Sequence, residues 1–152
     1  MADYFFDTSA LVKRYHPEVG SSKVEAIFRE HNRRIIISRL TVVELQSAFA
    51  LKIRTGQMNE RSSASLRLRA LDDVGTGTVT VVSVKDMHYA VAARLIVQHG
   101  SVKGLRTLDA LQLAVALEAH DLGGLDVLVA ADKTLCEVAA LEGLSVLNPE
   151  HP

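Results

Sequence analysis

Residues 1–15 read MADYFFDTSALVKRY, and residues 127–135 read VLVAADKTL. In each stretch a short apolar run ends at an aspartate, Asp7 or Asp132, and a helical pattern begins directly after it. Apolar runs of this length are typical of strands that are buried on both faces of a sheet. We therefore expect two strands that end in the same way, each followed by a helix.

The rest of the chain continues this alternation. Apolar, largely β-branched runs predict five strands, at Tyr4–Phe6, Ile35–Ile37, Val79–Val84, Val127–Ala131 and Ser145–Leu147. Helical spacing occupies residues 20–32, 39–54, 60–72, 85–99, 107–121 and 132–142, with a short helical turn over 9–15. Four glycines are expected to end helices: Gly56, Gly100, Gly123 and Gly143. The pattern predicts an α/β fold with three α/β/α layers, in which helices flank a mostly parallel sheet of about five strands.

Composition agrees with one folded domain, which we expect to span residues 1–152. Hydrophobic residues make up 48% of the chain and charged residues 23%, close to the average for a globular protein. The longest stretch without a charge, Val74–Val84, is too short to cross a bilayer, so no membrane partner is expected. Asp7 interrupts the only apolar run near the start, and Cys136 is the single cysteine. Both features favour a cytoplasmic protein without disulfides.

Charge is distributed unevenly although the formal net charge is only -1. Residues 1–70 contain 12 Lys and Arg against 7 Asp and Glu, whereas residues 71–152 contain 5 against 11. A basic half can steer a polyanion toward an acidic site. Solvated helix faces explain the same asymmetry without a ligand.

Four carboxylates stand at positions where chemistry is expected. Asp7 and Asp132 follow strands, and ligands bind at the carboxyl ends of parallel strands, although either aspartate could simply cap its helix. Glu44 lies in the apolar helix LTVVELQSAFAL (40–51), where a buried carboxylate needs a cation, a proton, strong hydrogen bonds or an arginine partner. Asp109 lies in the first turn of TLDALQLAVAL (107–117), a position that the helix dipole also favours.

If the four carboxylates converge, they predict a metal site. Like charges ~4 Å apart repel by ~4 kcal/mol per pair at an effective dielectric of ~20, so bound cations or raised pKa values are required. Oxygen ligands select Mg²⁺ or Mn²⁺. Zinc is not favoured, since the six histidines show no paired spacing and Cys136 stands alone. A site of this kind suits hydrolysis of phosphodiester bonds.

Four segments occur in order along the chain: FFDTSALVKRY, SRLTVVELQSAFA, RTLDALQLAVAL and VLVAADKTL. Together they resemble the four acidic motifs of PIN-domain ribonucleases, and the compact length is most similar to VapC-type toxins of toxin–antitoxin pairs. The resemblance implies that Asp7 and Asp109 are the principal metal ligands and that Glu44 and Asp132 complete the catalytic cluster, partly through water. It also implies that the hydroxyl of Ser9 holds a ligand or phosphate oxygen.

The resemblance further implies an endoribonuclease that cuts RNA to leave 5′-phosphate and 3′-hydroxyl ends. A homodimer and a cognate antitoxin that inserts a basic side chain into the acidic groove are expected as well. One departure is visible at Ala130, where the family often has Thr or Ser, and it puts a supporting hydrogen bond in doubt. Candidate phosphate contacts in this chain are Lys13, Arg14, Arg39, Lys52, Arg54 and Arg106.

Apolar residues on the helices at 39–54 and 60–72 exceed what one core face needs. They predict an association surface that includes Phe49, Ile53, Leu66 and Leu68, although each of them could instead belong to the core.

Other classes fit less well. An aspartyl-phosphate phosphatase needs a second Asp two residues after the first, and position 9 is Ser. A receiver domain needs an acidic pair at the first strand end, and Asp7 has Phe6 and Thr8 as neighbours. No GxGxxG follows the first strand, which disfavours a dinucleotide-binding domain. The alternative left open is a catalytically silent PIN-like module that docks a basic peptide in its acidic groove.

Overall fold

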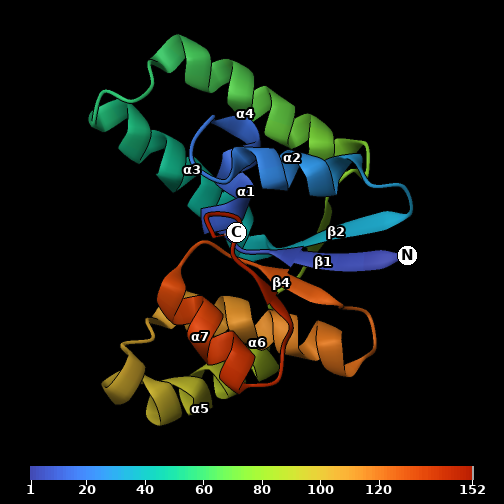
Figure 1. Ribbon diagram of the computed structural model, residues 1–152. Helices are drawn as coiled ribbons and strands as arrows, with labels where there is room; N and C mark the ends of the chain where they lie inside the picture. The colour runs from blue at the N-terminus through green and yellow to red at the C-terminus, as the bar shows by residue number, and fades with distance from the viewer. Residues whose placement is uncertain (152) are drawn as a thin grey trace.

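The computed structural model describes residues 1–151 and has a parallel five-stranded sheet at its centre (Figure 1). The strands are β1 (Ala2–Phe6), β2 (Arg33–Ser38), β3 (Thr80–Val82), β4 (Val127–Val129) and β5 (Val146–Leu147). Their order across the sheet is β3-β2-β1-β4-β5, with every neighbouring pair parallel. All five predicted strands are present, and the expected α/β/α architecture is confirmed.

Within residues 1–151, seven helices connect and flank these strands. They are α1 (Thr8–Tyr15), α2 (Ser21–Arg29), α3 (Arg39–Arg54), α4 (Glu60–Gly75), α5 (Asp86–Lys103), α6 (Thr107–Asp121) and α7 (Lys133–Leu141). The expected stop at Gly100 is wrong, because α5 continues through it for one more turn. Gly104 ends that helix instead, in the left-handed conformation (φ 74°) that glycine adopts without steric cost.

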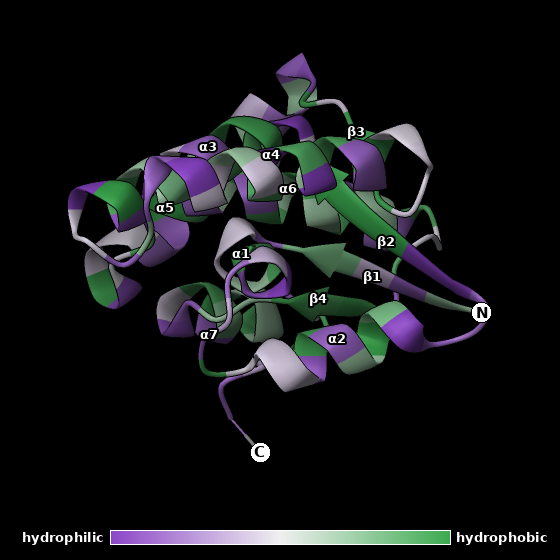
Figure 2. Ribbon diagram, turned by 90° about the horizontal axis from the view of Figure 1, so that it is seen from above, coloured by the Kyte–Doolittle hydropathy of each residue, from purple (hydrophilic) through white to green (hydrophobic). Residues whose placement is uncertain are grey.

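Alternating side chains along the strands divide the core into two layers. Phe5 and Leu128 point to one face of the sheet, where they pack with α5, α6 and α7. Phe6 and Val129 point to the opposite face, where α1, α2, α3 and α4 cover them. Figure 1 shows these two groups of helices on opposite sides of the sheet. In Figure 2, β4 and the C-terminal part of β2 are green, for hydrophobic residues, whereas the start of β2 is purple. Because both faces are covered, the strands read as continuous apolar runs.

Of the four apolar residues predicted for an association surface, the structure assigns Phe49 to the core and leaves the association itself as a prediction. Phe49 is fully buried in the second core layer, and Ile53 and Leu66 pack partly against that layer. Only Leu68 is exposed, at 68%. Other apolar side chains on α3 and α4 are also exposed: Val43, Leu51, Leu71 and Val74. Within residues 1–151, no helix combines the length and the apolar character needed to span a bilayer.

The sheet order places the chain reversal beside β1. From β1 the chain moves outward through β2 and β3, and it returns to the other side of β1 with β4. In parallel sheets, ligands bind beyond the carboxyl ends of the strands at such a switch point. Asp7 and Asp132 follow the two strands that meet there.

Candidate functional site

Asp7 is held rigidly at the end of β1. Its side chain is buried, and Oδ2 accepts hydrogen bonds from the Ser9 amide (3.1 Å) and the Ser9 hydroxyl (2.6 Å). The same hydroxyl accepts a hydrogen bond from the Ala131 amide (2.9 Å), so Ser9 links the ends of β1 and β4. Asp7 therefore caps α1, as the simpler interpretation proposed, but the cap uses only one carboxylate oxygen.

Glu44 reaches toward the same region from α3 without an arginine partner among residues 1–151. Its Oε1 accepts hydrogen bonds from the Gln112 amide nitrogen (2.6 Å) and the Thr8 hydroxyl (3.1 Å). The ion pair considered from the sequence is therefore wrong. Two neutral donors hold Glu44 in its place.

Asp109 and Asp132 share one cationic neighbour. The Arg106 guanidinium lies 3.6 Å from Asp109 Oδ2 and 3.8 Å from Asp132 Oδ2. The side chain of Arg106 is 78% exposed, so it holds these carboxylates loosely. Asp132 Oδ1 accepts a hydrogen bond from the Leu135 amide (2.8 Å) and caps α7, the simpler interpretation proposed for it.

Each of the four carboxylates has at least one oxygen that accepts no hydrogen bond from the part of the chain that the structure describes. For Asp7, Glu44 and Asp132, one oxygen is fixed by protein hydrogen bonds. The second oxygen of each accepts no hydrogen bond within residues 1–151, and neither oxygen of Asp109 does. Capping and ligand binding are therefore compatible in this geometry, because each carboxylate keeps an oxygen available.

Burial and mutual repulsion act on this group of charges. Burial raises the pKa of Asp7 to about 6, and the charges of Asp109 and Glu44 add to this against the Ser9 hydrogen bonds. Burial also raises the pKa of Asp109, with a further contribution from Asp132 that Arg106 opposes and a smaller one from Glu44. The four carboxylates thus affect one another electrostatically, and a bound cation would relieve the cost.

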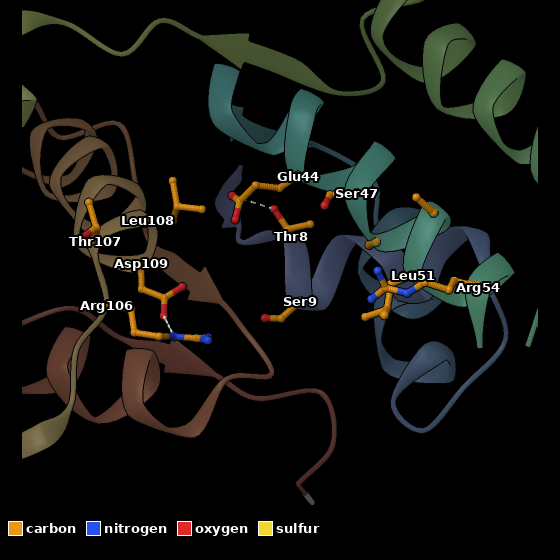
Figure 3. Close-up of a pocket in the computed structure, with 12 residues that line it drawn as sticks. Thr8, Ser9, Glu44, Ser47, Leu51, Arg54, Arg106, Thr107, Leu108 and Asp109 are labelled. Carbon is orange, nitrogen blue, oxygen red and sulfur yellow. Dashed lines mark hydrogen bonds and ion pairs between the residues drawn. The ribbon is translucent and has the colours of Figure 1, made fainter.

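A groove opens between α3 and α6 over this group, with a volume of about 1010 Å³. Glu44, Asp109 and Ser9 contribute to its walls, and Figure 3 shows these three side chains pointing into a common space. Arg54 and Arg106 lie along the same groove. Asp7 and Asp132 are not among the lining residues, and they connect to the groove through Ser9 and Arg106. We call this feature the α3–α6 groove.

The donor set suits a hydrated hard cation. Within residues 1–151, no three or more His, Cys, Asp or Glu side chains form a group that could enclose a metal. Mg²⁺ does not need such a cage, because it keeps several waters and binds through one or two carboxylates. The available carboxylate oxygens and the raised pKa of Asp7 fit that mode of binding. Closed tetrahedral ligation of the zinc type does not fit.

Of the six candidate phosphate contacts, only Arg54 and Arg106 line the groove. Lys13 is buried between Glu18 (3.0 Å) and Glu150 (2.7 Å), so it is a structural ion pair and not a phosphate contact. Three others also lie outside the groove: Arg14 pairs with Asp73, Lys52 pairs with Glu18, and Arg39 is exposed.

Sequence reasoning missed the polar residues that hold the carboxylates. Thr8, Thr41 and Gln112 are buried and hydrogen-bonded to one another or to Glu44. The available signal was an amide, Gln112, within the otherwise apolar run ALQLAVAL (110–117). A buried amide needs partners, so it indicates a polar network inside the core.

Three solved structures are similar to this chain in fold. VapC20 of Mycobacterium tuberculosis, described as a Sarcin-Ricin loop cleaving toxin, is 18% identical with a TM-score of 0.65, covering 93% of this chain and 95% of its own. FitAcB of Neisseria gonorrhoeae is 18% identical with a TM-score of 0.66, covering 98% and 99%. A toxin-antitoxin complex from Klebsiella pneumoniae is 18% identical with a TM-score of 0.56, covering 96% and 97%.

No curated protein matches the chain in sequence. The PIN domain family model matches residues 4–141, which include all four carboxylates and the strands that position them. The chain therefore belongs to the PIN domain family.

Proposed function

We propose that this chain is a metal-dependent endoribonuclease and the toxin of a toxin–antitoxin pair. The observation that carries the proposal is the arrangement of Asp7, Glu44, Asp109 and Asp132 at the carboxyl edge of the sheet, each with an oxygen free of protein hydrogen bonds. Membership of the PIN domain family supports a nuclease. The similarity to the Mycobacterium tuberculosis toxin supports RNA as the substrate.

Asp7 and Asp109 are proposed as direct ligands of Mg²⁺ or Mn²⁺, with Glu44 and Asp132 acting directly or through water. A divalent cation in this position would lower the pKa of a water molecule and offset negative charge on the leaving oxygen. The chain supplies the geometry. The Ser9 hydroxyl donates a hydrogen bond that holds Asp7, and the Leu135 amide donates one that holds Asp132. No side chain needs to form a covalent bond to the substrate.

RNA is proposed to lie in the α3–α6 groove. Arg54 and Arg106 would contact phosphates, and the exposed Leu51 and Leu108 provide apolar surface for the bases. Attack by water on phosphorus breaks the bond to the 3′ oxygen, so the products carry a 3′-hydroxyl and a 5′-phosphate.

A cognate antitoxin and a homodimer are proposed as partners. The Klebsiella pneumoniae neighbour is a toxin-antitoxin complex with the same fold, which supports a protein partner. Arg106 already places a guanidinium beside Asp109 and Asp132, so the geometry suits an inserted basic side chain from an inhibitor. The exposed apolar side chains of α3 and α4 are the candidate surface for self-association.

The same contact with Arg106 favours the alternative function, a silent module that docks a basic peptide. A cleavage assay separates the two. The protein is incubated with a mixed RNA pool in MnCl₂ and in EDTA, beside the variant Asp109→Asn. A nuclease cleaves only in Mn²⁺ and loses cleavage in the variant. A docking module leaves the RNA intact in every lane.

A further inference from the structure

Gln112 is a fully buried amide on α6, three residues after Asp109. It makes three short hydrogen bonds. Its Oε1 accepts from the Ser38 hydroxyl (2.6 Å), and its Nε2 donates to the Thr41 hydroxyl (2.7 Å) and to Glu44 Oε1 (2.6 Å). We call Ser38, Thr41 and Gln112 the Gln112 network.

The chemistry of Glu44 determines the orientation of this amide. An ionised carboxylate only accepts hydrogen bonds, so the nitrogen of Gln112, and not its oxygen, must face Glu44. The two protons on Nε2 are then both used, one on Glu44 and one on Thr41. The Ser38 hydroxyl donates to the remaining oxygen. With both amide protons and the amide oxygen used, one orientation of the Gln112 amide is favoured, and it holds Glu44 Oε1.

The Gln112 network joins the elements that carry two of the proposed ligands. Ser38 is the last residue of β2, and Thr41 lies in the first turn of α3, the helix that carries Glu44. Gln112 lies on the same side of α6 as Asp109, because residues three apart share a helix face. The network therefore fixes the distance between the helix that carries Glu44 and the helix that carries Asp109.

We infer that Gln112 is a positioning residue of the carboxylate site. By holding Glu44 Oε1, it keeps the second oxygen of Glu44 directed to the site where the cation is proposed to bind. Thr8 assists from α1 through a longer hydrogen bond to the same Oε1 (3.1 Å). This inference rests on the proposed function, since it concerns the ligands of that site.

The test replaces Gln112 with Met, which keeps the length of the side chain and removes both donors. Affinity for Mn²⁺ is measured on the full chain by electron paramagnetic resonance, with the metal alone as the probe. Loss of a group that orients a metal ligand costs about 10- to 100-fold in affinity, and we expect a loss in that range. Gln98→Met is the matched control, because Gln98 is exposed on α5 and accepts a hydrogen bond from Arg94, away from the carboxylates. It should bind Mn²⁺ like the wild type.

A thermodynamic cycle with Glu44→Ala shows whether Gln112 acts through Glu44. If it does, Gln112→Met weakens Mn²⁺ binding in the wild-type background and has little further effect when Glu44 is absent. An equal loss in both backgrounds, or wild-type affinity in the single variant, overturns the inference. If the wild type itself neither binds Mn²⁺ nor cleaves RNA, the proposed function fails first.

A second pair of variants keeps the inference falsifiable if Gln112→Met does not fold. Ser38→Ala removes the group that orients Gln112, and Thr8→Val removes the second donor to Glu44 while keeping a β-branched side chain. Each should weaken Mn²⁺ binding several-fold and have little effect in the Glu44→Ala background. Wild-type affinity in both variants contradicts a positioning role.

Discussion

Replacing Asp7 with Asn separates a metal ligand from a helix cap. Asn caps helices as well as Asp does, so the hydrogen bonds from Ser9 can be retained on the amide oxygen. The variant removes a buried negative charge that lies near Asp109 and Glu44. If Asp7 were only a cap, the change would leave RNA cleavage per folded molecule close to that of the wild type.

The size of the effect follows from the pKa of Asp7, which burial raises from its ordinary value of 3.8 to about 6. The difference between these two pKa values corresponds to about 3 kcal/mol. Because the folded state binds this proton more tightly than the unfolded state, the wild type loses this stability as the pH rises from about 4 to about 6. Above about pH 6, ionised Asp7 lowers the free energy of unfolding of the metal-free wild type by the full amount. The Asn variant has no charge at this position and does not lose this stability.

The assay is thermal unfolding in EDTA at pH 4 and pH 7.5, repeated at pH 7.5 in MnCl₂. In EDTA at pH 7.5, we expect the Asn variant to gain up to about 3 kcal/mol, or roughly 6–12 °C in Tm for a chain of this size. At pH 4 the two proteins should melt together. Saturating Mn²⁺ should stabilise the wild type by about 3 kcal/mol at one hundred times Kd, and the variant much less.

Asp121→Asn is the matched control, since Asp121 is exposed at the end of α6. It should leave Tm, its pH dependence and RNA cleavage unchanged. A ligand role for Asp7 is refuted if Asp7→Asn melts well below the wild type in EDTA at pH 7.5 and retains its cleavage rate per folded molecule. Asp7 would then be a cap and nothing more.

Three further changes test other parts of the structure. Arg106→Gln should tighten Mn²⁺ binding, because it removes a cation from beside two carboxylates, while a fluorescence titration should show weaker RNA binding with a smaller salt dependence. Asp73→Asn breaks the paired hydrogen bonds to Arg14, which is mostly buried, and should lower the free energy of unfolding in urea by about 2–3 kcal/mol; a change below 0.5 kcal/mol would contradict this. Leu68→Glu should shift self-association toward monomer in light scattering, and a wild type that is monomeric at tens of micromolar would remove the proposed dimer surface.

The fold could be predicted because its signals are local. Runs such as Ile35–Ile37 and Val127–Val129 are apolar at every position, which marks strands covered on both faces. The end of α5 was misjudged because Gly100 tolerates helical geometry, while Gly104 provides the left-handed conformation that ends the helix. The presence of a glycine in the sequence does not by itself show whether the helix continues through that residue or ends there.

The positions of Asp7, Asp109 and Asp132 could be predicted because strand ends and helix starts converge at one edge of a parallel sheet. The surrounding polar groups could not, because they depend on contacts between distant segments. The sequence offers Lys13 as a candidate phosphate contact. Its ion-pair partner Glu150 lies 137 residues later in the chain, so the pairing can be seen only in the folded structure. Gln112 and Ser38, 74 residues apart, meet only in the folded chain.

The most direct measurement is an anomalous difference map from crystals soaked in MnCl₂ and recorded at the manganese edge. We expect a peak between the carboxylates of Asp7 and Asp109, with the free oxygen of Glu44 or an intervening water directed toward it. The same peak should be absent in crystals of Asp7→Asn treated identically. Two results would contradict a metal-dependent nuclease at this site. One is the absence of density between Asp7 and Asp109 in wild-type crystals saturated with Mn²⁺, and the other is a peak that persists in the variant.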